Sequence, residues 1–493
     1  MASQNQDGNQ EIQRALENLQ NLGALKTLFW NTLNYQRVNQ KISPQNLSDA
    51  VTNEIEGELL LLAVAGNNNP FYVIYTCLKS ENISRQSERL VVNHFHQKYP
   101  YALFVFSNQS QSRWHFINVK YDENAHNTSQ QQILRRITVG DREQLRTAIE
   151  RISLLDLETL PDKSPLSIQA RIDEAFDVEA VTKEFFKEYD RIFKELEKKI
   201  KGINDENKKR LFTQKLFNRL LFIAFIEKKG WLEFQENTDY LSALWRDYNR
   251  RKGQKAKEAN FYKDRLSQFF FKGLNTPEEK REELKDLIGS VPFLNGGLFE
   301  QEEDDKNPNI IIPDSCIDSI LHDLFQRFNF TVTESTPLDV EVAVDPEMLG
   351  KVFEELVTGR HDTGSYYTPK AIVSFMCREA LKGYLKTTFP KESDDGVAKF
   401  VDEHNPDKLI HREDVLDALR RVRCCDLACG SGAYLLGMLH ELLDLRQCLF
   451  ENYQLGSNII YERKLEIIKN NLYGVDNNDL AVNIARLRLW LGC

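Results

Sequence analysis

Apolar and polar residues follow different patterns in successive parts of the chain. Near the N-terminus, three runs alternate apolar or aromatic residues with polar ones, which is typical of strands in a sheet. They are 71–79, 102–107 and 114–121. The runs 85–97 and 142–153 have helical spacing instead, and the proline-containing segment 160–165 is typical of a linker. We therefore expect an α/β domain over residues 1–155.

From residue 166 to about residue 340 the pattern becomes helical. Between positions 178 and 200 an apolar residue recurs every three or four positions, so that these side chains form one stripe along a helix. The run 211–229 is more apolar and predicts a second, more buried helix, which we expect to end at Gly230. We interpret 166–340 as a helical connector domain and 341–493 as a third domain.

One stretch of the connector is locally basic and has two tyrosines, Tyr248 and Tyr262, among its charges. Its basic residues are Arg246, Arg250, Arg251, Lys252, Lys255, Lys257, Lys263 and Arg265. This stretch is the best candidate for contacts with a DNA backbone, but a solvated surface is the favoured interpretation of such a charge run.

Composition narrows the class of protein. A chain of 493 residues accommodates about three domains, and 41% hydrophobic with 28% charged residues fits a soluble protein. The polar N-terminus and the lack of long apolar stretches predict a cytoplasmic protein without a membrane partner. A net charge of −10 argues against a protein that coats nucleic acid non-specifically, because such binding needs many phosphate contacts. Eight cysteines without a repeated metal-binding spacing predict no metal site.

The run 424–435, C-C-D-L-A-C-G-S-G-A-Y-L, carries the clearest candidate chemistry. An apolar lead-in, an acid, a Gly-x-Gly turn and a helix-forming segment are how an α/β sheet presents its backbone to a nucleotide-like ligand. Small residues at Ala428, Gly430, Ser431 and Gly432 allow the main chain to approach such a ligand closely. Downstream, 472–476 predicts a short buried strand that ends in an acid, before a helical run.

This run resembles the D-P-A-C-G-S-G-x-F-L signature of adenine-N6 DNA methyltransferases, and residues 363–370 resemble their T-G-x-[YF]-Y-T-P element. With the phrases 222–232, 294–300 and 345–350, most of the chain resembles large type IIG restriction–modification proteins. The resemblance implies a Rossmann-like, S-adenosylmethionine-dependent methyltransferase domain, of which 341–493 would be the N-terminal part. It also implies double-stranded DNA as a partner and methyl transfer to a flipped adenine.

The resemblance assigns roles to individual residues. Asp426 would face the methionine amino group of the cofactor, with a helix N-cap as the alternative role. Asp476 would accept hydrogen bonds from the ribose hydroxyls, with a cap for the helix beginning near Asp479 as the alternative. Leu427 stands where the family has proline, which predicts a looser turn. The complete predicted cofactor site is Asp426, Ala428, Gly430, Gly432, Asp476, Thr363, Gly364, Tyr367, Thr368 and Pro369.

The tetrapeptide [ND]-P-P-[YFW], which holds the target adenine in this family, is absent, because none of the 14 prolines is followed by another. We therefore expect an N-terminal portion of a longer or split enzyme, with no catalytic residues of its own. A C-terminal half or partner chain would carry the tetrapeptide and the target-recognition domain, and this chain would not methylate DNA alone. The alternative is a non-catalytic cofactor-binding or regulatory half of a split restriction–modification enzyme.

In type IIG proteins the N-terminal domain is commonly a PD-(D/E)XK nuclease, which places two acids and a lysine around Mg²⁺. Lys79 has the required place at the end of a predicted strand, and Glu58, among other acids upstream, could supply a carboxylate. Cys77 stands where the second acid should be, and a thiol is a poor ligand for Mg²⁺. We expect a nuclease-like scaffold without activity, with Mg²⁺ needed only if the domain is active. Cys77 also counts against a nuclease that uses the methyltransferase fold as a sensor.

Overall fold

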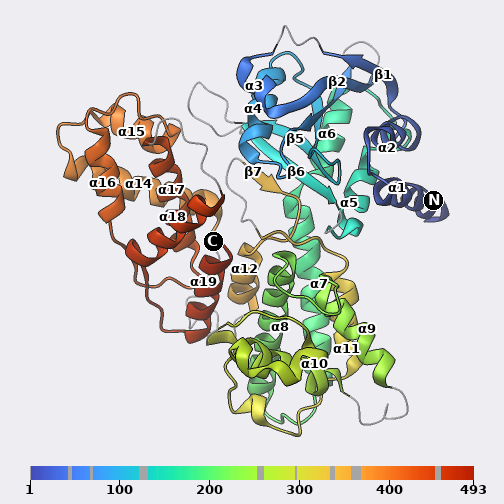
Figure 1. Ribbon diagram of the computed structural model, residues 1–493, viewed down its shortest axis with the longest axis vertical. Coiled ribbons are helices and arrows are strands. Elements are labelled where there is room, and N and C mark those ends of the chain that lie inside the picture. Colours follow the sequence, from blue (N-terminus) through green and yellow to red (C-terminus); the bar gives the residue numbers. More distant parts are fainter. Residues whose placement is uncertain are drawn as a thin grey trace. The chain divides into compact units, whose positions relative to one another are not determined.

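The computed structural model of the protein describes residues 2–42, 47–66, 70–121, 132–140, 143–252, 260–294, 297–332, 339–356, 368–449 and 457–492. The chain forms two compact units, which we describe separately (Figure 1). The N-terminal unit comprises 1–199, 312–331 and 335–345; the C-terminal unit comprises 200–311, 332–334 and 346–493. The predicted division into three domains stays a prediction.

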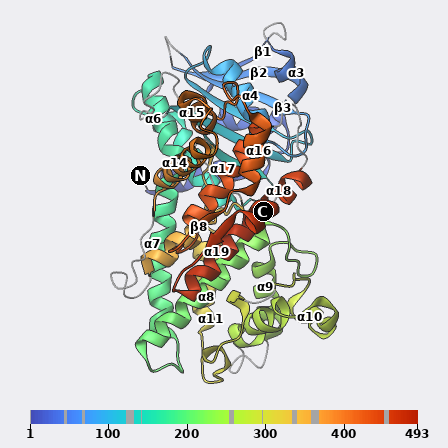
Figure 2. The ribbon, with the colours of Figure 1, turned by 90° about the vertical axis from the view of Figure 1, so that its left-hand side faces the viewer.

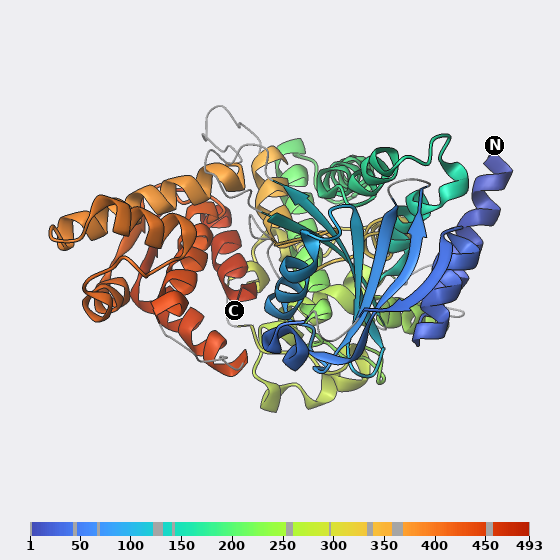
Figure 3. The same ribbon diagram turned by 90° about the horizontal axis from the view of Figure 1, so that it is seen from above.

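A mixed seven-stranded sheet forms the centre of the N-terminal unit, with its strands in sequence order (Figure 3). The strands are β1 (Gln36–Lys41), β2 (Ile55–Ala65), β3 (Phe71–Leu78), β4 (Ala102–Ser107), β5 (Arg113–Tyr121), β6 (Gln132–Gly140) and β7 (Asp339–Glu341). Neighbouring strands are antiparallel except for the parallel pairs β3–β4 and β6–β7. The three predicted strands and the α/β class are confirmed.

Helices flank this sheet and are joined by short 3-10 and π-helical segments. The helices are α1 (Ala2–Glu17), α2 (Leu22–Thr27), α3 (Asp49–Glu54), α4 (Arg85–His96), α5 (Leu145–Ile152), α6 (Pro165–Ala175), α7 (Val178–Lys199) and α11 (Asp314–Ser319). Helix α4 connects the parallel strands β3 and β4 and packs Val91, Val92 and Phe95 into the core. The predicted linker ends where Ser164 caps α6 by accepting the N–H of Ser167.

The C-terminal unit is mostly helical. Its helices are α8 (Glu206–Lys228), α9 (Tyr240–Lys252), α10 (Lys285–Ile288), α12 (Glu347–Leu356), α14 (Lys370–Thr388), α15 (Asp394–Glu403), α16 (Arg412–Arg421), α17 (Ala433–Leu449), α18 (Ser457–Asn470) and α19 (Asp479–Leu491). Helix α8 is the predicted second helix; its segment from Phe212 to Ile226 is buried apart from Lys215. Gly230 ends it with φ 74°, as predicted.

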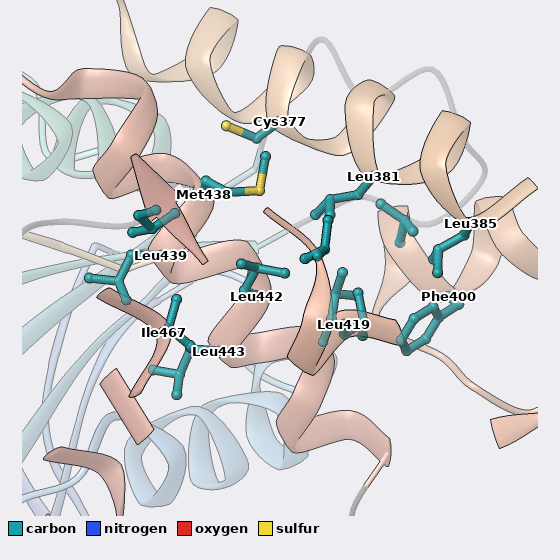
Figure 4. Packing of buried hydrophobic residues seen from close by; sticks show 14 of the residues in the cluster. Cys377, Leu381, Leu385, Phe400, Leu419, Met438, Leu439, Leu442, Leu443 and Ile467 are labelled. Atoms are coloured by element: carbon teal, nitrogen blue, oxygen red, sulfur yellow. The ribbon is translucent and has the colours of Figure 1, made fainter. Parts of the chain in front are cut away.

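Two short parallel strands, β8 (Cys424–Asp426) and β9 (Leu472–Gly474), lie beside the helices of the segment 368–492. Leucines of α14, α16 and α17 pack with Phe400 of α15 into one apolar core (Figure 4). On the strands and just after them, Leu427, Tyr473 and Val475 remain exposed. Apolar side chains therefore reach the surface of the described residues at this end of the two strands.

Helix α19 lies along α8, so that residues 200–311 of the predicted connector share one unit with the glycine-rich segment (Figure 2). The Trp490 ring lies 5.7 Å from Phe222 and 4.6 Å from Trp231, measured between ring centroids. Lys229 Nζ lies over both tryptophan rings. No helix in the described ranges is long and apolar enough to cross a membrane.

Candidate cofactor-binding site

The glycine-rich turn connects the carboxyl end of β8 to the start of α17. Gly430 and Gly432 have φ values of 51° and 88°, in the left-handed region that residues with a Cβ rarely adopt. A Cβ on Gly432 would lie 2.9 Å from Ala485 Cβ of α19, whereas one on Gly430 would come no closer than 3.7 Å to Glu354. Gly432 therefore allows helix packing, and Gly430 leaves open space beside the turn.

The two strands hold this turn through backbone hydrogen bonds that continue beyond the sheet. Asp426 pairs with Gly474, the Val475 N–H donates to the Asp426 carbonyl at 2.9 Å, and the Cys429 N–H donates to the Val475 carbonyl at 2.9 Å. Buried Cys429 packs against Gly474, where a Cβ would lie 3.1 Å from its Sγ. Burial raises the pKa of the Cys429 thiol, which fits a small residue that fills the turn.

Asp426 has one carboxylate oxygen that is engaged and one that is not. Oδ1 accepts the N–H of Ala428 at 3.2 Å. Oδ2 is buried and has no hydrogen-bond partner among the described residues. The alternative role as N-cap of α17 does not hold, because that helix begins only at Ala433. A ligand with an N–H or ammonium group could satisfy Oδ2.

Asp476 connects the end of β9 to the turn. Its Oδ2 accepts the N–H of Gly430 at 2.8 Å, and its Oδ1 accepts the N–H of Asn478 at 2.9 Å. The predicted alternative, a cap for the next helix, is wrong: Asn478 caps α19 by accepting the N–H groups of Leu480 and Ala481. Each carboxylate oxygen of Asp476 keeps a second lone pair that could accept from a ligand hydroxyl.

Ser431 lies between the two glycines, and its side chain is buried. Its hydroxyl donates to Glu354 Oε1 of α12 at 2.6 Å, and Arg488 Nη1 of α19 donates to its carbonyl at 3.0 Å and to Oγ at 3.2 Å. The Ser431 side chain is buried on this side of the turn, and the expectation that its small size allows a close approach of the main chain to a ligand stays a prediction. Glu354 and Arg488 were not predicted as site residues from the sequence.

A signal for Arg488 is present in the sequence. In α19 the positions 481, 484, 485, 488 and 491 form one buried stripe, and arginine occupies one of them. A buried arginine needs an acceptor, so this position predicts a polar partner in the interior. Nothing in the sequence alone identifies that partner as the hydroxyl and carbonyl of Ser431, 57 residues away along the chain.

The predicted residues before α14 are described only in part. Thr368 and Pro369 precede this helix, which packs closely on α17: a Cβ on Gly437 would lie 2.4 Å from Val373 Cγ1. Thr363, Gly364 and Tyr367 lie outside the described residues. Ala428 donates its N–H to Asp426, and the neighbouring Leu427 side chain is 79% exposed.

The nuclease candidates engage the surrounding protein. Lys79 Nζ donates to the Thr52 carbonyl at 3.1 Å, and buried Cys77 donates its thiol to the Asn108 carbonyl at 3.3 Å. Opposite Cys77 in the sheet register lies Glu56; the side chain of Glu58 is outside the described set. In the described parts of the chain, no three His, Cys, Asp or Glu side chains gather to hold a metal ion.

The basic stretch is partly internal. Asp247 is buried and pairs with Arg250, Arg251 and Arg265, whose nitrogens lie 2.7, 2.9 and 3.1 Å from its carboxylate. Arg265 is itself buried. Arg265 is therefore an internal partner of Asp247 and is not available for DNA contacts, whereas Arg250 and Arg251 pair with Asp247 from exposed positions.

One comparison with known proteins covers the segment that carries the glycine turn. Residues 402–492 match the family of MmeI DNA-methyltransferase domains. A Methanocaldococcus jannaschii protein described as a type II restriction enzyme and methyltransferase is 30% identical over 359 residues, 64% of this chain. This chain spans only 30% of the length of that relative.

Two solved structures match this chain at low sequence identity. The type IIL restriction–modification enzyme MmeI in complex with DNA is 20% identical, with a TM-score of 0.37, over 64% of this chain and 36% of that one. A DrdV–DNA complex is 12% identical, with a TM-score of 0.25, over 99% of this chain and 38% of that one. The family match and the sequence relative together confirm the predicted resemblance: this chain is related to type II restriction–modification enzymes that carry a methyltransferase.

Proposed function

We propose that this chain supplies the cofactor-binding part of an adenine-N6 DNA methyltransferase from a restriction–modification system. The observation that carries the proposal is Asp426 Oδ2, a buried carboxylate oxygen without a hydrogen-bond partner among the described residues, at the start of the glycine turn. Leaving such an oxygen unsatisfied is costly, so the site favours a ligand with a positively charged or N–H group there. The amino group of S-adenosylmethionine has this chemistry.

Each part of the cofactor would contact different residues in and around the turn. Asp426 would hold the amino group of the methionine part, and the open space beside Gly430 would let the ligand approach the backbone. Asp476, already fixed by two backbone N–H groups, would present its remaining lone pairs to the ribose hydroxyls. Thr368 and Pro369, with Thr363, Gly364 and Tyr367, would cover the methionine end. S-adenosylmethionine, when bound, supplies an electrophilic methyl group.

The target adenine needs groups that these 493 residues do not provide. Because the sequence contains no Pro-Pro pair, we place the adenine-binding tetrapeptide and the target-recognition domain on a further segment or a partner chain. Double-stranded DNA would bind mainly there, with the adenine flipped out of the duplex. The type IIG class and a cytoplasmic location belong to the same proposal. Mixing this chain with such a partner should restore methylation that neither shows alone.

The alternative is a regulatory half that binds the cofactor without taking part in methyl transfer. The unpaired oxygen Asp426 Oδ2 supports both versions, since each needs a cofactor-binding site at the turn. The two versions differ in what the partner chain does by itself. A regulatory half would change the rate of a partner that already methylates DNA alone. Measuring methylation by the isolated partner decides between them.

For the N-terminal unit we propose a nuclease-like scaffold that does not cleave DNA. Cys77 occupies the acid's place and its thiol is engaged with a backbone carbonyl, while Lys79 is held by Thr52. With no acid at this position, one of the two ligands for Mg²⁺ is missing. Incubation of the chain with plasmid DNA and Mg²⁺ should leave the plasmid intact, and specific fragments would overturn this view.

Calorimetric titration with S-adenosylmethionine tests the central proposal. We expect saturable binding by the unmodified chain and its loss in Asp426→Ala. Asp417→Ala is the matched control, because Asp417 is an exposed acid of α16 whose carboxylate pairs with nearby Arg420. Absence of binding by a folded chain, or equal effects of the two substitutions, would refute the assignment of this turn.

A further inference from the structure

Three buried polar residues from separate elements meet at the glycine turn. Ser431 of the turn, Glu354 of α12 and Arg488 of α19 are 2%, 6% and 3% exposed. Ser431 donates to Glu354 at 2.6 Å and accepts from Arg488 through both its hydroxyl and its carbonyl. We call this group the turn clamp. Space around it is tight: a Cβ on Gly350 of α12 would lie 2.5 Å from Ser431 Oγ.

The turn needs an external anchor because its flanking residues are glycines. Gly430 and Gly432 both have positive φ, and glycine loses more conformational freedom on folding than any other residue. Leu427 is exposed and stands directly after Asp426, where the resembling methyltransferase signature has proline. Leucine does not restrict φ as proline does, so this residue does not fix the turn. The clamp fixes Ser431, the residue between the two glycines, in the interior. Its position thus limits the conformations of both neighbours.

We propose that Glu354 and Arg488 are positioning residues for the cofactor-binding turn. They act through Ser431 and do not touch the ligand. By holding Ser431 from α12 and α19, they keep the Gly430 N–H directed at Asp476 and the space beside Gly430 open for the ligand. This inference rests on the proposed function, because it assumes that the turn binds S-adenosylmethionine.

The same unit contains a similar group that serves as a matched control. Ser374 of α14 donates its hydroxyl to Glu441 Oε1 at 2.8 Å, and Arg378 Nε donates to the same oxygen at 2.8 Å. Ser374 is half-buried, and Glu441 is buried in α17. Removing either serine hydroxyl deletes a Ser–Glu hydrogen bond beside an arginine, but only Ser431 lies in the turn.

The test compares Ser431→Ala with Ser374→Ala in the full chain. We expect Ser431→Ala to weaken S-adenosylmethionine binding at least about tenfold, or about 1.4 kcal/mol, and Ser374→Ala to leave it within about twofold. Hydrogen exchange in the ligand-free chain provides a second readout: only Ser431→Ala should speed exchange of residues 429–435. Equal effects of the two substitutions on both readouts, or unchanged values for Ser431→Ala, would overturn the proposal.

Two substitutions at Glu354 test whether its hydrogen bond with Ser431 is needed to position the turn. Glu354→Gln keeps an oxygen that can accept from Ser431, and Glu354→Ala removes it. We expect the glutamine variant to bind more tightly than the alanine variant and to protect the turn amides better. Indistinguishable variants would count against positioning. If the unmodified chain does not bind S-adenosylmethionine, the proposed function fails, and the exchange of residues 429–435 still decides whether the clamp fixes the turn.

Discussion

At the scale of single residues, the two glycines of the turn have the same backbone requirement but different surroundings. Both have positive φ, which costs a residue with a Cβ about 1–2 kcal/mol. Only Gly432 faces close neighbours, since a Cβ there would lie 2.9 Å from Ala485 Cβ and 3.2 Å from its Cα. Overpacking of this kind costs about 1–3 kcal/mol more. Identical substitutions at the two positions should therefore have unequal effects.

We predict that Gly432→Ala lowers the free energy of unfolding by about 2–5 kcal/mol and Gly430→Ala by about 1–2 kcal/mol. Gly383→Ala is the control: this exposed glycine lies within α14 and has no atom within 4 Å of its Cβ position. There alanine should stabilise by about 0.5–1 kcal/mol through its helix propensity. Urea unfolding followed by circular dichroism measures all three. Equal losses at positions 430 and 432 would contradict the contact with Ala485.

The turn also shows how far a sequence can predict a site. The strand that ends at Asp426 and the glycine turn after it were predictable as local structure, because a strand, an acid and a Gly-x-Gly turn are adjacent in the chain; their role in cofactor binding stays a prediction. The partners of Ser431 were not, because Glu354 and Arg488 reach it from helices 77 and 57 residues away. The cap of α19 was misassigned because Asp476, Asn478 and Asp479 are all suitable caps, and only the backbone geometry selects Asn478.

At the scale of elements, helix α4 carries a buried charge into the sheet of the N-terminal unit. Glu88 is fully buried; Arg136 Nη2 of β6 and His115 Nδ1 of β5 contact its carboxylate, the latter at 2.5 Å. Burial raises the pKa of Glu88, but His115 and Arg136 outweigh this effect and lower it from 4.5 to about 2. The charged form of Glu88 therefore stabilises the connection between α4 and the sheet.

We predict that Glu88→Gln destabilises the N-terminal unit by about 3–5 kcal/mol at neutral pH, since Arg136 loses a buried partner. The pKa of Glu88 is lowered in the folded state, so its contribution is present above pH 4.5 and is lost as the pH falls toward 2. The stability difference between the two proteins should thus shrink on acidification, by at most about 1.4 kcal/mol per pH unit. Urea unfolding midpoints between pH 7 and pH 3 provide the measurement.

Glu150→Gln is the control for this experiment. Glu150 pairs with Arg146 on the exposed side of α5, four residues apart, and such pairs contribute about 0.3–0.5 kcal/mol. Its substitution should leave both the stability and its pH dependence nearly unchanged. A pH profile of Glu88→Gln parallel to that of the unmodified chain would show that Glu88 does not titrate in the expected window.

Elements with a regular period were the most predictable. The strands β3 and β4 and the helix α7 appear where alternation or three-to-four spacing predicted them, because each buries one continuous set of side chains. Strand β7 was not predicted: it has only three residues and pairs with β6 after about 200 intervening residues. Such a short strand exists because of its tertiary partner, and its local sequence carries little signal.

At the scale of the whole molecule, the described residues gather into two units, and the second unit combines residues 200–311 of the predicted connector with the glycine turn. Within this unit, helix α19 of the glycine-turn segment packs Trp490 against Phe222 of α8 and Trp231 just after it. Aromatic pairs of this kind contribute about 0.5–1.5 kcal/mol beyond their buried area. The stability of α8 should therefore depend on α19.

We predict that Trp490→Ala destabilises the C-terminal unit by about 2–3 kcal/mol, because a half-buried tryptophan loses two aromatic neighbours. Hydrogen exchange should accelerate together in α8 (Glu206–Lys228) and α19 (Asp479–Leu491), and stay unchanged in α4 of the N-terminal unit. Tyr461→Ala, which removes a 49% exposed ring from α18, should leave both helices protected. Faster exchange confined to α19 would mean that the connector is stable independently and that these helices are not one cooperative body.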